Sequence, residues 1–325
     1  MAANAPAWDS LPDPGDVLIA RVTGSTDRTW FYESGQQSVR ELERTLALIE
    51  RPLDSFSSIL DFGCGCGRML MWLEELGKRT KLHGTDVDAE AIAWAAERFP
   101  YCTFTANGAD PPLPYEDGAF DLIFNHSVFT HIDERSQDAW LAELQRVTRP
   151  GGFLVLCVNG EWVLNDDWSE AHVRLEDTGH LFLPDMRPPA ELGHPEWYAS
   201  TFNAPWYVFE RWARWFNIRG YIPRAALNLQ DHVLLERPAP GERRIRPLAA
   251  RPPRSAPPTA EQRVLAAQAQ IGAGSSRFGA LGRGLRHIVL RLMRPYTAHQ
   301  QRIEVELARS IDQLASAQQS ERPRP

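Results

Sequence analysis

The 325-residue sequence predicts an α/β protein with a doubly wound, seven-stranded sheet whose last strand is antiparallel, followed by a helical C-terminal tail. Two observations predict the sheet. Between residues 57 and 158, short apolar runs alternate with amphipathic stretches of helical length. Several runs, such as FDLIFNH at 120–126, are almost wholly apolar, as buried strands are. Strands that alternate with helices give a parallel sheet covered on both faces.

The N-terminal segment predicts a helical cap over residues 1–56. Within it, Val39, Leu42, Leu46 and Ile49 recur at helical spacing, which indicates a helix over 27–50. The alternating region then predicts strands and helices in turn. The expected strands are 57–62, 80–86, 102–106, 120–126 and 152–158, and the expected helices are 68–76, 89–99 and 136–148.

Residues 159–204 interrupt the alternation and are rich in Trp, His and Pro, so we expect an insert that covers a substrate. Its notable side chains are Trp162, Trp168, His172, His180, His194 and Trp197. A helix is expected over 205–216, and two final strands over 217–223 and 230–238. The connection between these strands is too short for a crossover, so the strand near 231–236 should be antiparallel.

The C-terminal part differs in charge from the rest. The chain has a net charge of −7, but from residue 238 onward 15 arginines face 6 acidic residues, about +9, which leaves about −16 for the first 237 residues. We predict a Pro/Arg-rich linker over 238–262 and a basic, helical tail over 263–325. In the tail, an apolar stripe among arginines at 281–293 suits either the surface of an anionic membrane or self-association.

The composition favours a cytoplasmic protein. Four cysteines in a chain of this length do not make a disulfide framework, and a reducing compartment fits them best. The first residues lack the basic flank and apolar segment of a signal peptide. No apolar run is long enough to cross a bilayer, so any membrane contact should be peripheral, through the tail at the inner surface. The acidic N-terminal part argues against nonspecific nucleic-acid binding, which requires Lys and Arg.

The segment ILDFGCGCGRM, residues 59–69, is the strongest local signal. Its two cysteines form a lone CxC, whereas a zinc site needs about four ligands and a redox pair is usually CxxC, so no metal is predicted. Its glycines follow a strand in the pattern DxGxGxG, Asp61 to Gly67, which lets the backbone approach a ligand. The dinucleotide fingerprint GxGxxG would need glycine where Arg68 stands, which disfavours an NAD enzyme.

This pattern resembles motif I of the class I S-adenosylmethionine (SAM)-dependent methyltransferases. The resemblance covers residues 57–158 and extends more weakly to 237; PPLPYEDGAFDLIF and ELQRVTRPGGFLVL also match the family. It implies a Rossmann-like methyltransferase domain over 57–237 with SAM as cofactor. Asp86 would bind the ribose hydroxyls, and either Asn107, which we favour, or Asp110 would meet the adenine. The implied cofactor contacts are Asp61, Gly63, Cys64, Gly65, Gly67, Asp86, Val87, Asn107 and Asn125.

The stretch NHSVFTHID supplies two candidate catalytic bases, His126 and His131. A hydroxyl acceptor needs a base, and the pKa of histidine lies near neutrality. His131 is similar in place to a histidine of ubiquinone-biosynthesis O-methyltransferases, but Thr130 replaces the acidic neighbour that can help hold a metal there. The sequence DPPL at 110–113 precedes the fourth strand rather than following it, which argues against amino methylation of nucleic acid.

We therefore expect O-methylation of a hydroxyl on a small molecule or a glycan, including a lipid-linked glycan, because the tail resembles segments of bacterial glycan-assembly enzymes. Nucleic acid is not expected as a partner. The alternatives are a SAM-binding or scaffold protein without catalysis and, from a different class, an NAD-dependent oxidoreductase.

Overall fold

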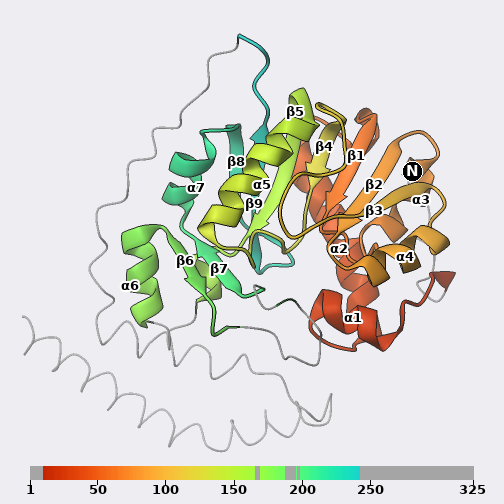
Figure 1. Ribbon diagram of the computed structural model, residues 1–325, viewed down its shortest axis with the longest axis horizontal. Helices are drawn as coiled ribbons and strands as arrows, with labels where there is room; N and C mark the ends of the chain where they lie inside the picture. The colour runs from red at the N-terminus through yellow and green to blue at the C-terminus, as the bar shows by residue number, and fades with distance from the viewer. Residues whose placement is uncertain (1–9, 165–168, 187–194, 196–197, 242–325) are drawn as a thin grey trace, which may run out of the picture. The chain divides into compact units, whose positions relative to one another are not determined.

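The computed structural model of the chain describes residues 10–164, 169–186, 195 and 198–241 (Figure 1). The chain divides into two compact units, one of residues 1–164 and 174–251 and one of residues 165–173 and 252–325. The candidate site belongs entirely to the first unit. The tail predicted over 263–325, and the linker from residue 242 onward, lie outside the described residues, so their proposed roles stay predictions.

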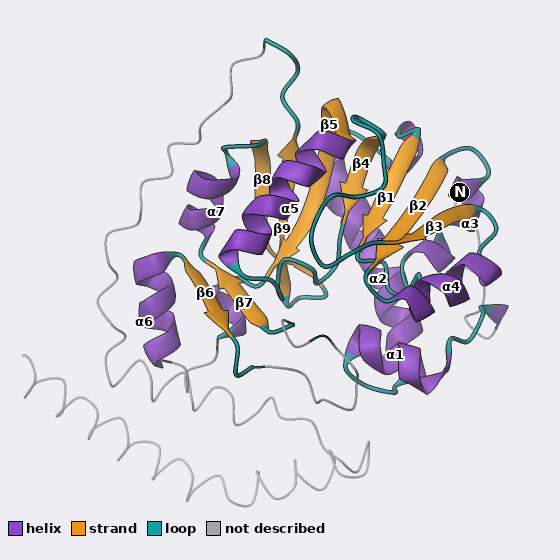
Figure 2. Ribbon diagram, viewed as in Figure 1, coloured by secondary structure: helices purple, strands orange, loops and turns teal. Residues whose placement is uncertain are grey.

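A seven-stranded sheet forms the centre of the first unit, in the order β3-β2-β1-β4-β5-β9-β8 (Figure 2). Strands β1 to β5 are parallel to one another, whereas β9 is antiparallel to both β5 and β8. The predicted fold class and antiparallel last strand are therefore confirmed. The strands are β1 (Ser58–Phe62), β2 (Lys81–Asp86), β3 (Cys102–Ala106), β4 (Phe120–Phe124), β5 (Thr148–Val158), β8 (Asn217–Ala226) and β9 (Gln230–Glu236).

Helices cover both faces of this sheet. On one face, α5 (Glu134–Val147) and α7 (Pro205–Trp212) pack in a core cluster with the strands, and on the other face α2 (Arg28–Ala47) and α4 (Ala89–Arg98) do so. In Figure 1, α5 crosses in front of the sheet and α2 lies behind it. Burial of apolar residues on both faces explains why the strands contain near-continuous apolar runs.

Aspartates begin three of these helices. The side chain of Asp27 accepts a hydrogen bond from the N–H of Trp30 at the start of α2, and Asp133 accepts one from Ser136 at the start of α5. Asp88 caps α4 in the same way through the N–H groups of Glu90 and Ala91. These caps satisfy backbone donors that have no partner inside the helix, so they fix where each helix begins.

Two parts of the first unit differ from the sequence prediction. Helix α1 (Gly15–Thr23) was not predicted, although Pro14 precedes it and Gly24, with φ of 73°, ends it. The predicted helix over 68–76 is instead a 3₁₀ turn, η3 (Leu70–Trp72), and one short turn, α3 (Glu74–Gly77). Positive φ angles in the glycine loop persist as far as Gly67, so a right-handed helix can begin only after that residue.

The insert forms a small structure of its own. Its described elements are η4 (Glu161–Val163), α6 (Ser169–Thr178) and a two-stranded antiparallel sheet of β6 (His180–Leu183) and β7 (Ser200–Asn203). Within the described residues, no helix is long and apolar enough to cross a membrane.

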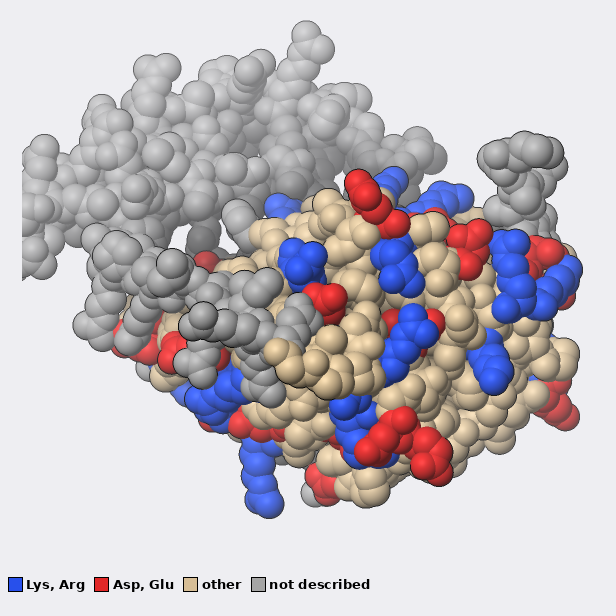
Figure 3. Space-filling view, turned by 90° about the horizontal axis from the view of Figure 1, so that it is seen from above, with Lys and Arg blue, Asp and Glu red and all other residues tan. Residues whose placement is uncertain are grey.

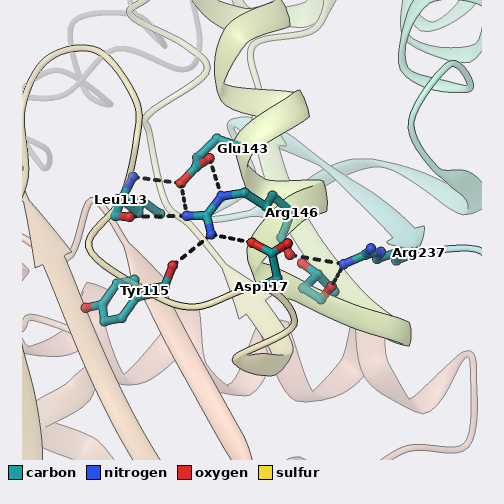
Figure 4. Close-up of polar contacts among 7 residues, drawn as sticks. Leu113, Tyr115, Asp117, Glu143, Arg146 and Arg237 are labelled. Atoms are coloured by element: carbon teal, nitrogen blue, oxygen red, sulfur yellow. Dashed lines mark hydrogen bonds and ion pairs between the residues drawn. The ribbon is translucent and has the colours of Figure 1, made fainter.

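A polar network around Arg146 of α5 fixes the loop between β3 and β4 (Figure 4). The guanidinium donates hydrogen bonds to the carbonyl oxygens of Leu113 and Tyr115 and forms ion pairs with Asp117 and Glu143. The Glu143 carboxylate, 7% exposed, also accepts a hydrogen bond of 2.7 Å from the N–H of Leu113. The same loop carries residues of the candidate site described below.

Replacing Arg146 with alanine should lower the free energy of unfolding by about 1.5–3 kcal/mol, because the buried Glu143 carboxylate would lose its charged partner. Urea denaturation followed by circular dichroism measures this. Arg79→Ala is the matched control, since Arg79 is 65% exposed in its ion pair with Asp54 and should change stability by less than about 0.5 kcal/mol. Equal midpoints for the two variants would contradict the role given to Arg146.

Candidate functional site

The glycine loop after β1 is held against the end of β2 by backbone hydrogen bonds. The N–H of Gly63 donates to the carbonyl oxygen of Thr85 at 2.7 Å. Gly63 has φ of +83°, and a Cβ atom there would lie 2.2 Å from the Cγ2 atom of Val128. Both the backbone conformation and the close approach of the loop after β4 therefore require glycine at this position.

Asp86, the last residue of β2, links the glycine loop to the start of α4. One carboxylate oxygen accepts a hydrogen bond of 2.8 Å from the N–H of Gly65, and the other accepts one of 2.9 Å from the N–H of Asp88. Burial raises the pKa of Asp86, and these two backbone donors partly offset that effect. The carboxylate is thus fixed in position beside the loop.

A cavity of about 390 Å³ lies at this edge of the sheet. Its volume falls in the range of small-molecule sites, about 300–1,000 Å³. It is formed by the glycine loop, the ends of β2 and β4, helix α1 and part of the insert. Its lining includes Arg21, Asp61, Gly63, Cys64, Gly65, Arg68, Asp86, Val87, Asn107, His126, Ser127, His131, Trp140, Pro195 and Tyr198.

Most of the predicted cofactor residues line this cavity, and two do not. Gly67 and Asn125 are absent from the lining, whereas Asp61, Gly63, Cys64, Gly65, Asp86, Val87 and Asn107 are present. Asn125 is 3% exposed, and its side-chain oxygen accepts a hydrogen bond of 2.7 Å from the N–H of Cys157. Its described role is therefore to join the ends of β4 and β5.

Asn107, rather than Asp110, faces the cavity at the end of β3. Its side-chain oxygen accepts a hydrogen bond of 2.8 Å from the hydroxyl of Thr85, and its amide nitrogen donates to the carbonyl oxygen of Gly108. These bonds orient the side chain beside Asp86. The position agrees with the preference for Asn107 as the adenine contact, which stays a prediction.

Both candidate bases, His126 and His131, line the cavity, but their surroundings differ. The Nδ1 atom of His131 lies 2.9 Å from the carbonyl oxygen of Ala199, and the ring stacks on Tyr198 at 3.9 Å between centroids. A carbonyl only accepts, so Nδ1 carries the proton in this bond. The pKa of His126 is lowered well below its ordinary value, first by burial and then by the charge of Arg68.

The insert contributes to the cavity through Pro195 and Tyr198. Backbone hydrogen bonds join it to the loop after β4, including one of 2.8 Å from the N–H of Thr201 to the carbonyl oxygen of Thr130. The expectation that the insert covers a substrate is consistent with this contact and stays a prediction. Several of its singled-out side chains lie outside the described residues: Trp168, His194 and Trp197.

The sequence did not indicate several residues of the cavity wall. Arg21 comes from the unpredicted helix α1, and Tyr198 from the irregular insert. Ser127 has a positive φ of 64°, a strained conformation of a kind that is often found at functional sites, and nothing in the sequence reveals it. Arg68 follows the glycines in the sequence, where it disfavours an NAD enzyme, but its place in the cavity wall was not predicted.

Asp61, at the end of β1, has a strongly perturbed carboxyl group. Burial raises its pKa from 3.8 to about 8, although the nearby Arg68 charge acts in the opposite direction. Between these values the folded protein keeps a proton that the unfolded chain releases. Ionisation of Asp61 therefore makes the free energy of unfolding fall as the pH rises from about 4 to about 8. Above about pH 8 the carboxyl group is ionised in both states, and its effect on stability no longer changes with pH.

Asp61→Asn should remove this pH-dependent contribution. The melting temperature of the variant relative to that of the wild type is expected to rise between pH 5.5 and pH 8 and then to level off, because only the wild type must ionise a buried carboxyl group. Differential scanning fluorimetry in matched buffers measures the difference. A difference that is constant over this range would contradict the raised pKa of Asp61.

Among residues 10–164, 169–186, 195 and 198–241, no group of three or more His, Cys, Asp or Glu side chains could hold a metal ion. Cys64 and Cys66 of the glycine loop are free and buried, and burial raises the pKa of Cys66 to about 12. A protonated thiol is a poor metal ligand and a poor nucleophile, so these side chains serve as small apolar packing groups.

Comparison with known proteins identifies the domain that contains this cavity. Residues 59–152 match the model of a methyltransferase domain family. The ribosomal protein L11 methyltransferase of Geobacter metallireducens is 28% identical over 152 residues, 46% of each chain. The malonyl-[acyl-carrier protein] O-methyltransferase of Pectobacterium atrosepticum is 31% identical over 168 residues, 51% of this chain and 61% of its own. The matches thus span less than two thirds of these relatives.

Further relatives are named as methyltransferases of ribosomal RNA and of trans-aconitate. A solved SAM-dependent methyltransferase from Methanosarcina mazei is 20% identical, with a TM-score of 0.42, over 56% of this chain and 92% of its own. Together with the glycine loop, the acid at the end of β2 and the strand order, the matched model identifies residues 59–152 as a class I SAM-dependent methyltransferase domain.

Proposed function

We propose that the chain transfers a methyl group from SAM to a hydroxyl oxygen of a small molecule or a glycan. The observation that carries the proposal is that one cavity is lined both by the glycine loop with Asp86 and by His131 with Tyr198. The first set combines a glycine-rich backbone that a cofactor can approach closely with a fixed carboxylate that can accept hydrogen bonds. The second set offers a side chain that can take a proton and an aromatic wall for an acceptor.

The residues present fit SAM. Gly63 and Gly65 would lie under its methionine part, Asp86 would accept hydrogen bonds from its ribose hydroxyls, and Asn107 would meet its adenine. When bound, SAM supplies a methyl group on a positively charged sulfur. The protein's part is mainly to hold the acceptor oxygen in line with that group, since positioning can contribute about 7–11 kcal/mol to a rate.

Of the two candidate bases, His131 is better suited. Its hydrogen bond to Ala199 fixes the ring and places the Nδ1 proton, so Nε2 is the atom that can accept a proton from a hydroxyl. His126 is hindered because burial and the positive Arg68 disfavour its imidazolium form. We propose that His126 instead donates or accepts a hydrogen bond as a neutral ring.

The acceptor class is the less constrained part of the proposal. The relatives' names include protein, acyl-carrier and ribosomal RNA substrates, so the domain alone does not determine the acceptor. The expectation that it is not nucleic acid stays a prediction. On the face seen in Figure 3, positive and negative side chains are interspersed, and a broad field of positive charge is not seen there.

The test uses the full chain with SAM labelled in its methyl group and fractionated cell extract. Label should enter a small-molecule, glycan or lipid-linked glycan fraction, and treatment with protease or nuclease should not release it. Label found only in nucleic acid or protein would overturn the proposed acceptor. Tight SAM binding with no transfer to any fraction would favour a non-catalytic SAM-binding protein.

A further inference from the structure

Two consecutive residues of the insert, Tyr198 and Ala199, hold the ring of His131. The Nδ1 atom of His131 lies 2.9 Å from the carbonyl oxygen of Ala199, and the ring stacks on that of Tyr198 with centroids 3.9 Å apart and planes at 19° to each other. The N–H of Ala199 in turn donates a hydrogen bond of 3.3 Å to the carbonyl oxygen of His131. The imidazole is therefore fixed at its Nδ1 edge and covered on one face.

The segment that carries these two residues is joined to the loop after β4 by buried hydrogen bonds. The N–H of Thr201 donates to the carbonyl oxygen of Thr130, and its hydroxyl donates to that of Ile132, each at 2.8 Å. The side chain of Asn159 donates to the carbonyl oxygen of Thr201 at 3.0 Å. Thr130 and Thr201 are fully buried, so this junction brings Tyr198 against His131 without help from a ligand.

The stack favours the charged form of the histidine over its neutral form. The face of a tyrosine ring carries partial negative charge and attracts a cation that lies within about 6 Å of the ring centroid. A neutral imidazole in the same place gains much less. Burial raises the pKa of the Tyr198 phenol, so the tyrosine stays neutral near pH 7 and acts through its ring face.

We propose that Tyr198 is a positioning residue that stabilises the protonated form of His131 during methyl transfer. The inference rests on the proposed function, in which His131 is the base. His131 takes the proton of the acceptor hydroxyl at Nε2, and the electron pair of that O–H bond stays on the oxygen. The oxygen bonds to the methyl carbon while the electron pair of the carbon–sulfur bond remains on sulfur. Positive charge thus appears on the imidazole, beside the face of Tyr198.

Other charged groups near His131 are the same in every variant described below. Asp133 and Glu134, next along the chain, accept hydrogen bonds at the start of α5 and from the hydroxyl of Tyr207. The remaining charged or titratable groups of the cavity are Arg21, Asp61, Arg68, Asp86, Asp88 and His126. A change confined to Tyr198 therefore isolates the contribution of its ring.

Nuclear magnetic resonance of the full chain tests the inference without an acceptor, with the His131 signals assigned from His131→Asn. The midpoint of the His131 titration should be about 0.4–1.5 pH units lower in Tyr198→Leu than in the wild type, because the leucine has no ring face to attract the cation. Tyr198→Phe is the matched control, since it keeps the ring and loses only the hydroxyl, and its midpoint should stay close to that of the wild type. Tyr198→Met replaces the leucine variant if that protein does not fold.

Nitrogen chemical shifts in the same experiment show whether Nδ1 keeps its proton, and therefore whether Ala199 still holds the ring. We expect the same tautomer in all variants. A midpoint that is unchanged or higher in the folded leucine or methionine variant would overturn the inference. A midpoint that falls only together with loss of the Nδ1 proton would also overturn it, because Tyr198 would then merely support the insert.

Turnover provides a second measurement, with the labelled acceptor fraction as substrate. In Tyr198→Leu the plateau of kcat should fall, by at most about 30-fold, and the acidic limb of the pH profile should move to lower pH. A residue that only supports the insert would lower the plateau and leave the acidic limb in place. If no transfer is detected, the proposed function fails and the His131 titration alone decides the inference. If transfer occurs but neither the midpoint nor the limb moves, the inference fails and the proposed function stands.

Discussion

Replacing Asp86 with alanine is expected to weaken SAM binding by about 1.5–3 kcal/mol, the scale of hydrogen bonds to a charged group. The carboxylate is fixed by the N–H groups of Gly65 and Asp88, so the variant loses both the ribose contact and the support of the glycine loop. Isothermal titration calorimetry measures the loss as an affinity about 10-fold to 150-fold lower.

Asp54→Ala is the matched control for Asp86. Its carboxylate is about half exposed, pairs with Arg79 and does not line the cavity, so the variant should bind SAM with the affinity of the wild type. An additional variant, Asp86→Asn, keeps one acceptor oxygen and should bind with intermediate affinity. An unchanged affinity in Asp86→Ala would contradict the position given to the ribose.

Replacing His131 with alanine is expected to lower kcat by about 10²–10⁴, the usual contribution of a positioned general base, while SAM affinity stays nearly unchanged. The ring is oriented by the carbonyl oxygen of Ala199 and by Tyr198. Turnover is measured with the labelled acceptor fraction from the transfer experiment.

His131→Asn distinguishes a base from a residue that only holds the insert. The asparagine amide can still donate to the carbonyl oxygen of Ala199, but it cannot take up a proton. If His131 is the base, both variants should lose activity to a similar extent. Activity restored by asparagine would reduce His131 to a positioning residue, and a larger loss in His126→Ala would transfer the role to that histidine.

The parts of the molecule that were predicted well depend on local chemistry. The DxGxGxG pattern located the glycine loop because positive φ angles restrict those positions to glycine. Asp86 was expected beside the loop because it ends the second strand, and its carboxylate does accept a hydrogen bond from the N–H of Gly65. The antiparallel direction of β9 was predicted because the segment that joins β8 to β9 is too short for a crossover, and the length of that segment can be read from the sequence.

The parts that were missed depend on tertiary contacts. Asn125 follows a strand just as Asp86 does, but its side-chain oxygen accepts a hydrogen bond from the N–H of Cys157 in β5, and its contact with the cofactor stays a prediction. The Arg68 guanidinium donates hydrogen bonds to the hydroxyl oxygens of Ser34 and Ser38, which lie about thirty residues earlier in the chain. No local pattern shows that Gly35 of α2 approaches Arg68 closely, so the surroundings of the Arg68 guanidinium were not predictable.

The central claim is that SAM occupies the cavity beside the glycine loop, and hydrogen–deuterium exchange of the full chain, with and without SAM, tests it most directly. We predict slower exchange in peptides that contain the glycine loop, the end of β2 with the start of α4, and residues 107–109, with smaller changes elsewhere in the described part of the chain. NAD⁺ at the same concentration should leave these peptides unchanged. SAM binding with no protection of these peptides, or equal protection by NAD⁺, would contradict the account.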